Sequence, residues 1–150
     1  MAISANHLRA LGRISVEFGS AEWLLGHIIS VLIGDDLEVG EIVTSHATFR
    51  ERTDLFYSLF KHKYGQRKCP ELKTILTDGQ RLVEERNRYI HSFWSDDGRL
   101  DSVTRSKVSA RIPKGLHEEK AAVSSGKLNE LADNFEKWSQ RLIDFIGEVI

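Results

Sequence analysis

An arginine, an asparagine and a histidine stand close together in the segment Arg86-Asn87-Arg88-Tyr89-Ile90-His91. These residue types can cleave a phosphodiester without a metal. A guanidinium presents a planar fork to phosphate oxygens and keeps its charge, so Arg86 would bind the phosphate as negative charge develops. An imidazole has an unperturbed pKa of about 6.5, so His91 would act as acid or base near neutral pH. Asn87 would orient His91 or hold a substrate oxygen.

The helix that carries these residues is predicted to run from Pro70 to about Phe93, because proline is favoured where a helix opens. Arg86 falls in the middle of its apolar face, Asn87 lies at the edge of that face, and His91 follows one turn later. An unpaired buried charge costs several kcal/mol, so Arg86 must find anions or acceptors. Polar groups on a core-building helix are typical of functional sites. The apolar face itself comprises Leu72, Ile75, Leu76, Gly79, Leu82, Val83, Ile90 and Phe93.

The pattern Arg86-Asn87-x-x-x-His91 resembles the signature of the HEPN superfamily, which is an arginine, a polar residue, a few spacers and a histidine. The resemblance in helix order covers most of the chain, with the motif near the end of the third main helix. It implies an all-helical bundle and a metal-independent endoribonuclease of the toxin–antitoxin or phage-defence type, with Arg86, Asn87 and His91 as catalytic residues. It also implies a homodimer whose two motifs line one cleft. Two His91 side chains would then supply the acid and the base, with no cofactor and no metal.

Two other interpretations of the same residues stay open. Arg86 can pair with an acidic residue on a neighbouring helix, and His91 near a helix C-terminus is favoured by the helix dipole by about 0.3–1 kcal/mol. The chain would then be a non-catalytic helical interaction domain, or a nucleotide-binding domain, with a degenerate motif. Alternatively, it is a toxin-like domain that an antitoxin or another protein partner restrains.

Two residues beside the motif are the predicted substrate contacts: Arg88 for phosphate and Trp94 for stacking on a base. Tyr57 and Tyr64 are further candidates for stacking on unpaired bases of RNA. A solvated helix face with aromatic residues in the core is the commoner outcome for each of these residues taken singly. A local basic stretch accompanies them, comprising Arg50, Arg52, Lys61, Lys63, Arg67 and Lys68.

The pattern of elements predicts an all-α fold, an up-and-down bundle of four main helices. The first helix is capped by Ser4 or Asn6 and ends at Gly34, and residues 36–46 form a short helix or turn. The second helix runs from Thr48 to Tyr64, and the last one follows a cap at Ser124-Ser125. Between the third and fourth helices, at 95–125, we expect a short hairpin or irregular excursion. It is marked by the turn residues Asp96-Asp97-Gly98 and by alternation at Val108, Ala110 and Ile112.

Length and composition narrow the class of protein. A chain of 150 residues fits one domain, spanning 1–150. The 21 Lys and Arg residues stand against 22 Asp and Glu residues, so a nucleic-acid partner would need a local patch. Cys69 is the single cysteine, which excludes a disulfide framework, and the histidines show no metal-ligand spacing. The most apolar run, Trp23 to Ile33, is shorter than the about 18 residues of a membrane span, so we expect a cytoplasmic domain without a membrane contact.

Overall fold

The computed structural model describes residues 3–34, 36–96, 98, 101–111 and 115–150. A mostly helical fold is confirmed in these residues, with a small antiparallel sheet between the last two helices. The helices are α1 (Ala5–Ile33), α2 (Leu37–Thr44), α3 (Phe49–Tyr64), α4 (Cys69–Ile90) and α5 (Ser125–Val149). The strands are β1 (Phe93–Asp96), β2 (Val103–Arg111) and β3 (Gly115–Val123), in the order β1-β2-β3.

The helix ends follow the predicted caps. Ser4 and Ser124 each accept a hydrogen bond from a backbone N–H of the first turn of α1 and α5, respectively. Thr48 begins α3 with a complete capping box, in which its hydroxyl and the Glu51 carboxylate satisfy each other's backbone N–H. Gly65 ends α3 at φ 76°, a left-handed conformation that favours glycine. These interactions join near neighbours in the chain, which is why the sequence predicts them.

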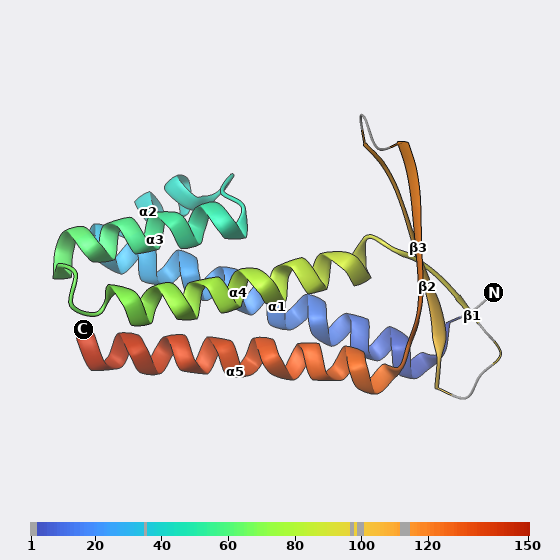
Figure 1. The fold of residues 1–150 in the computed structure, drawn as a ribbon. Helices are drawn as coiled ribbons and strands as arrows, with labels where there is room; N and C mark the ends of the chain where they lie inside the picture. The colour runs from blue at the N-terminus through green and yellow to red at the C-terminus, as the bar shows by residue number, and fades with distance from the viewer. Residues whose placement is uncertain (1–2, 35, 97, 99–100, 112–114) are drawn as a thin grey trace.

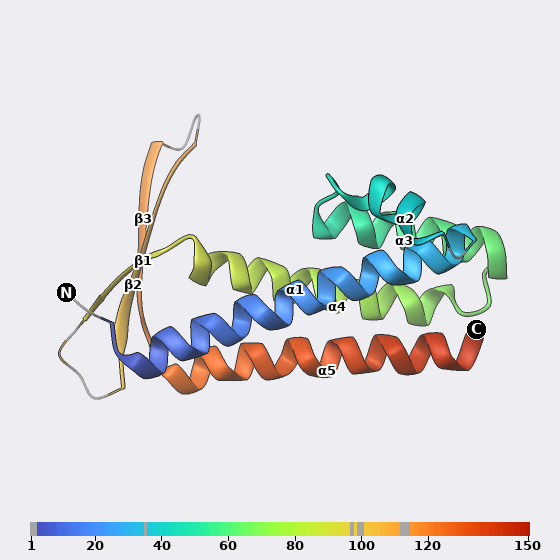
Figure 2. The same ribbon diagram turned by 180° about the vertical axis from the view of Figure 1, so that it is seen from behind.

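The long helices α1, α4 and α5 run lengthwise, while α2 and α3 cover one half of this layer and the sheet stands at the other end (Figures 1 and 2). An aromatic cluster forms where α1, α3 and α5 meet. The Phe18 ring lies 6.0 Å from the Phe49 ring and 6.1 Å from the Phe135 ring, and Phe49 lies 5.6 Å from Trp138. Phe18 and Trp138 of this cluster also contact α4, at Arg86 and Ile75, respectively.

Gly79 lets α4 approach α5 closely. A Cβ added at Gly79 would lie 2.6 Å from the ring of Trp138, which is a distance that real side chains do not tolerate. Trp138 is buried, and its indole N–H donates a 2.7 Å hydrogen bond to the Ile75 carbonyl oxygen. The glycine inside the helix is therefore explained by the packing of one large ring, at a cost of about 1 kcal/mol in helix propensity relative to alanine.

Among the described residues, α1 is the one helix long and apolar enough to cross a membrane by length and composition, with a mean hydropathy of 1.4. In the structure, 33% of its apolar stretch is buried. Its buried residues include Ile14, Ala21, Leu25 and Ile29, all within the hydrophobic core. The buried part of the apolar stretch of α1 thus belongs to the core of the domain.

The segment between the last two helices is more ordered than a short hairpin or irregular excursion. β1 pairs antiparallel with the first part of β2, and β2 pairs with β3 along its whole length. The alternation at Val108 and Ala110 lies in β2, as predicted, whereas Ile112 and Asp97 lie outside the described residues. The sequence pattern does not predict β1, because Phe93 continues the apolar periodicity of the preceding helix and Asp96 belongs to the predicted turn.

α4 ends earlier than predicted, at Ile90 rather than near Phe93. His91 is its C-cap, and its backbone N–H donates to the Asn87 carbonyl oxygen at 3.2 Å. Phe93 begins β1 and pairs with Ser106 of β2. Aromatic residues fit the pleated surface of a sheet well, so strand pairing overrides the apolar periodicity that extends the helix. The correction places His91 at a helix end.

Candidate functional site

The three predicted catalytic residues lie together at the C-terminal end of α4, with Arg86 and Asn87 in its last turns and His91 as its C-cap. In Figure 1 this part of α4 lies between α3 and the sheet. The Arg86 side chain is half-buried and faces the core, Asn87 is half-buried at the edge of the helix, and His91 is exposed. The placement follows from helical geometry, since residues one turn apart share a side of the helix.

The Arg86 guanidinium is held by an aromatic ring and an amide. Its central carbon lies 4.1 Å from the centre of the Phe18 ring, and Nη1 donates a 2.9 Å hydrogen bond to the Asn87 Oδ1. No acidic side chain of the described residues forms an ion pair with it. The alternative interpretation, in which Arg86 pairs with a carboxylate on a neighbouring helix, is therefore not seen in these residues. Its Nε is buried and has no hydrogen-bond partner among the described residues. No carboxylate in this part of the chain therefore neutralises its positive charge.

The Asn87 side-chain amide forms one hydrogen bond in the described part of the chain, through its oxygen. Its oxygen accepts from Arg86, which leaves the NH₂ group as its available donor. Among the described residues, the hydrogen bond between Asn87 and His91 is the backbone one, and no side-chain hydrogen bond joins them, so the expected orientation of the His91 imidazole by the Asn87 amide is not seen. Asn87 instead helps to line a pocket of about 250 Å³ at the start of α3. The other lining residues are Thr48, Phe49, Arg50, Gln80, Val83 and Glu84.

The two predicted substrate contacts differ in their surroundings. Arg88 is exposed, and its side chain lies on the solvent side of α4. Trp94 is half-buried, and its indole N–H donates a 3.0 Å hydrogen bond to the Tyr89 carbonyl oxygen. The Trp94 ring also lies 6.1 Å from the buried ring of Tyr89. Phe93, which is 67% exposed, is the freely accessible ring beside the motif.

Arg105 is a site residue that sequence reasoning missed. Only 4% of it is exposed, and its guanidinium donates to the Arg88 carbonyl oxygen at 3.5 Å and to the Ser92 hydroxyl at 3.3 Å. It also forms an ion pair with Glu119 of β3. Arg105 thereby ties the C-terminal end of α4, where the carbonyl groups lack helical partners, to the sheet. The sequence offers one signal for it: Arg105 is two residues from Val103, so in a strand both side chains lie on the same, inward face.

Two ionisable groups near the motif carry shifted pKa values. Burial of Tyr89 raises the pKa of its hydroxyl, and the nearby Glu85 carboxylate raises it further. The hydrogen bond from Arg105 lowers the pKa of Glu119, and the charge of Arg105 adds to this effect. The sheet and the end of α4 are thus electrostatically coupled.

The basic stretch of α3 does not form one surface beside the motif. Arg50 lies next to Asn87 in the same pocket. Arg52 is used for structure, because it donates to the carbonyl oxygens of Glu22 and Ala47. Lys68 pairs with Glu71 and Glu148 at the far end of α4. Of the predicted patch, Arg50 is therefore the residue that the structure brings to the site.

In the described part of the chain, no group of three or more His, Cys, Asp or Glu side chains is arranged to hold a metal ion. The chain was also compared with known proteins. No family model matches it, and neither a curated protein nor a solved structure is significantly similar to it.

Proposed function

We propose that this chain is a metal-independent endoribonuclease, with α1, α3, α4 and α5 as the four helices of a HEPN-like bundle. One observation carries the proposal: an arginine without a carboxylate partner among the described residues, an asparagine bonded to it and an exposed histidine share the end of α4. A histidine and an arginine are the groups that phosphodiester cleavage without a metal requires.

The proposed reaction uses the 2′-hydroxyl of the RNA as the nucleophile. A base removes the 2′-hydroxyl proton, the 2′-oxygen bonds to phosphorus, and the bond from phosphorus to the 5′-oxygen breaks. An acid gives a proton to that 5′-oxygen. Arg86 neutralises the added negative charge on the phosphate oxygens, and the Asn87 NH₂ group donates to one of them. The products are a 2′,3′-cyclic phosphate and a 5′-hydroxyl.

The reaction needs both an acid and a base, and the motif of one chain offers a single imidazole. We therefore propose a homodimer in which the second copy supplies the other His91. Three exposed apolar side chains lie on one face of the sheet that follows the motif, at Phe93, Val108 and Leu116. The strand register places them along a diagonal row, because Phe93 pairs with Ser106 and Val108 pairs with Glu118. Such a row fits an interface better than it fits water.

Cleavage of RNA in the presence of EDTA tests the activity. The wild-type protein should cut a labelled single-stranded RNA, and His91→Ala should lose at least about 100-fold in rate, in the range typical of a catalytic proton transfer. His62→Ala is the matched control, because His62 is also exposed but lies on α3. Absence of cleavage by the wild type across varied RNAs, or equal cleavage by His91→Ala, would contradict the proposal.

Mixing subunits tests the composite site. When His91→Ala chains are mixed with wild-type chains and allowed to exchange, mixed dimers contain one imidazole. If both are needed, activity falls with the square of the wild-type fraction, whereas independent sites give a linear fall. A linear fall would contradict the shared site and leave the activity itself in place.

One observation favours the second candidate function, a non-catalytic interaction or nucleotide-binding domain. Arg86 packs over Phe18, as a structural arginine would. Thermal unfolding of Arg86→Ala separates the two functions. A large loss of stability in this variant, together with no RNA cleavage by the wild type, supports the structural role of Arg86. Toxicity on expression alone, relieved by a co-expressed partner, would point to a restrained toxin. We propose a cytoplasmic location for each of these functions.

A further inference from the structure

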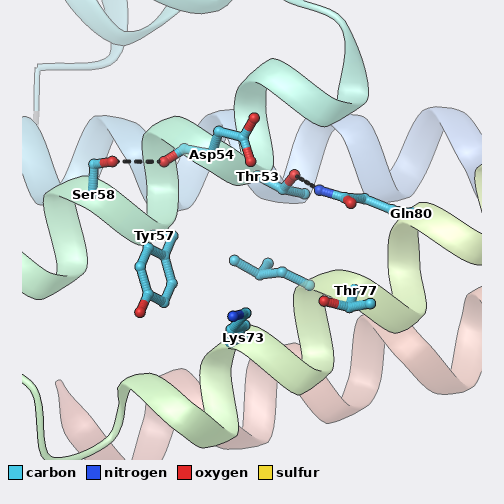
Figure 3. Close-up of a pocket in the computed structure, with 8 residues that line it drawn as sticks. Thr53, Asp54, Tyr57, Ser58, Lys73, Thr77 and Gln80 are labelled. Carbon is cyan, nitrogen blue, oxygen red and sulfur yellow. Dashed lines mark hydrogen bonds between the residues drawn. The ribbon is translucent and has the colours of Figure 1, made fainter.

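A polar pocket lies between α3 and α4, outside the motif. It has a volume of about 430 Å³, which is within the range of ligand pockets. Figure 3 shows Tyr57 on one side of this space and Thr77 and Gln80 on the other, with Lys73 from α4 below. The lining residues are Thr53, Asp54, Tyr57, Ser58, Lys73, Leu76, Thr77 and Gln80.

The pocket combines an aromatic ring, a cation and polar edges. Tyr57 is half-buried, and it packs against the core while it also lines the pocket. Lys73 is exposed and forms no ion pair with any described residue. The Gln80 NH₂ group donates a 2.7 Å hydrogen bond to the Thr53 hydroxyl, which leaves the Gln80 oxygen as an acceptor.

The position of Gln80 is fixed by a short chain of hydrogen bonds. The Thr53 hydroxyl accepts from Gln80 and donates to the Arg50 carbonyl oxygen at 2.7 Å. Thr53 is fully buried, so this arrangement is protected from water. The Gln80 oxygen and the Asp54 carboxylate therefore offer acceptors for N–H groups of a ligand, one from each wall of the pocket.

A second pocket lies beside this one, toward the motif. Gln80 also lines the second pocket, the one that contains Arg50 and Asn87. From Gln80 to Asn87 the helix advances about two turns, or roughly 10 Å. A ligand that occupies both pockets would thus extend from Tyr57 past Gln80 to Asn87. Lys73 would lie at one end of it and Arg50 near the other.

We propose that the Tyr57 pocket binds an unpaired base of the RNA strand whose phosphate lies at Arg86. The base stacks on Tyr57, its N–H groups donate to Gln80 and Asp54, and Lys73 contacts a backbone phosphate. This site rests on the proposed function and makes single-stranded RNA the substrate, because a base within a duplex is not free to enter a pocket between two helices. The combination of stacking and one cation per phosphate is typical of single-strand binding.

Binding is measured with the His91→Ala protein, which does not cut the probe, and a fluorescently labelled single-stranded RNA of 20 mixed nucleotides. Tyr57→Leu should weaken binding about 10-fold, because stacking of a base on an aromatic ring is lost. Tyr57→Phe should bind like the parent protein. The matched control is Trp23→Leu, since Trp23 is also an accessible aromatic residue, 68% exposed, but lies on α1 and does not line this pocket.

The salt dependence of binding tests Lys73. Lys73→Ala should reduce the slope of log affinity against log salt by about 0.7, the value for one phosphate contact on a single strand. Lys127→Ala on α5 should leave the slope unchanged. Photocrosslinking of RNA that contains 4-thiouridine should label Tyr57 in the His91→Ala protein.

The outcomes separate this proposal from the proposed function. If the wild type cleaves RNA while Tyr57→Leu and Lys73→Ala bind and cut normally, the base site is wrong and the ribonuclease stands. If the probe binds with the expected losses but the wild type never cleaves, the base site stands and the ribonuclease is wrong. Equal affinity for single mononucleotides and for the strand would overturn the proposed strand path.

Discussion

The central carbon of the Arg86 guanidinium lies over the Phe18 ring, 4.1 Å from the ring centre. The contact joins α4 to α1, and it holds a charge at the edge of the aromatic core. The ring attracts the cation without neutralising it, because a π face carries no net charge. Arg86 can therefore pack against Phe18 and still carry the positive charge that binding of a phosphate requires.

Replacing Arg86 with methionine separates these two roles. Methionine keeps much of the apolar stem, so we expect the free energy of unfolding to fall by only about 1 kcal/mol, from the lost cation–π contact. RNA cleavage should fall about 100-fold or more, because the transition-state charge loses its partner. Urea unfolding and cleavage rates on the same samples measure both. A loss of several kcal/mol would assign Arg86 to the core instead.

Arg105 should control the order of the turn that follows α4. Arg105→Leu removes the donor to the Arg88 carbonyl oxygen and to Ser92, so we expect a loss of about 1–3 kcal/mol in unfolding free energy. Glu119 is left without its partner but is half exposed and stays hydrated. Hydrogen exchange should become faster at the backbone amides of His91 and Ser92. Unchanged exchange at these amides would show that the turn does not depend on Arg105.

The ion pair of Arg105 with Glu119 predicts a loss of stability in acid. The pKa of Glu119 in the folded chain is lowered from its usual value of 4.5 by Arg105. A lowered folded pKa means that the contribution is present above pH 4.5 and is lost as the pH falls through the folded value. Unfolding free energies of the wild type and Glu119→Gln should therefore differ at pH 6, and the difference should shrink as the pH falls below 4.5. A difference that does not shrink at all below pH 4.5 would rule out ionisation as its cause.

Gly79→Ala should destabilise the chain even though alanine is the better helix former. Its Cβ would overlap the Trp138 ring, and overpacking of a core costs about 1–3 kcal/mol, against a gain of about 1 kcal/mol in helix propensity. Gly12→Ala is the matched control, because nothing lies within 4 Å of an added Cβ there. Gly12→Ala should raise the midpoint of thermal unfolding while Gly79→Ala lowers it. The reverse order would contradict the packing of α4 on α5.

The exposed sheet face predicts where two copies meet. Phe93→Ser should shift the protein toward monomer in sedimentation experiments and should lower cleavage in parallel, because the shared site is lost. Trp23→Ser is the control, since Trp23 is 68% exposed on α1. If Trp23→Ser produces monomers and Phe93→Ser does not, the copies associate through α1.

The helices of this protein are largely readable from the sequence. Ser4, Thr48 and Ser124 begin helices through contacts three residues away, and periodic apolar residues mark the buried faces. The motif residues Arg86, Asn87 and His91 are also found from their spacing, since one helix displays all three. The end of α4 and the strand β1 could not be predicted, because Phe93 takes its conformation from pairing with Ser106.

By itself, the sequence determined which segments coil and which residues share a helix turn, because caps and periodicity act between near neighbours along the chain. Only the tertiary structure decided the surroundings of those residues. It set Arg86 on Phe18, fastened the end of α4 with Arg105, and opened a polar pocket between Tyr57 and Gln80. Each of these relations joins elements that are separate in the chain, and their geometry is fixed by how the helices and the sheet pack rather than by local preference.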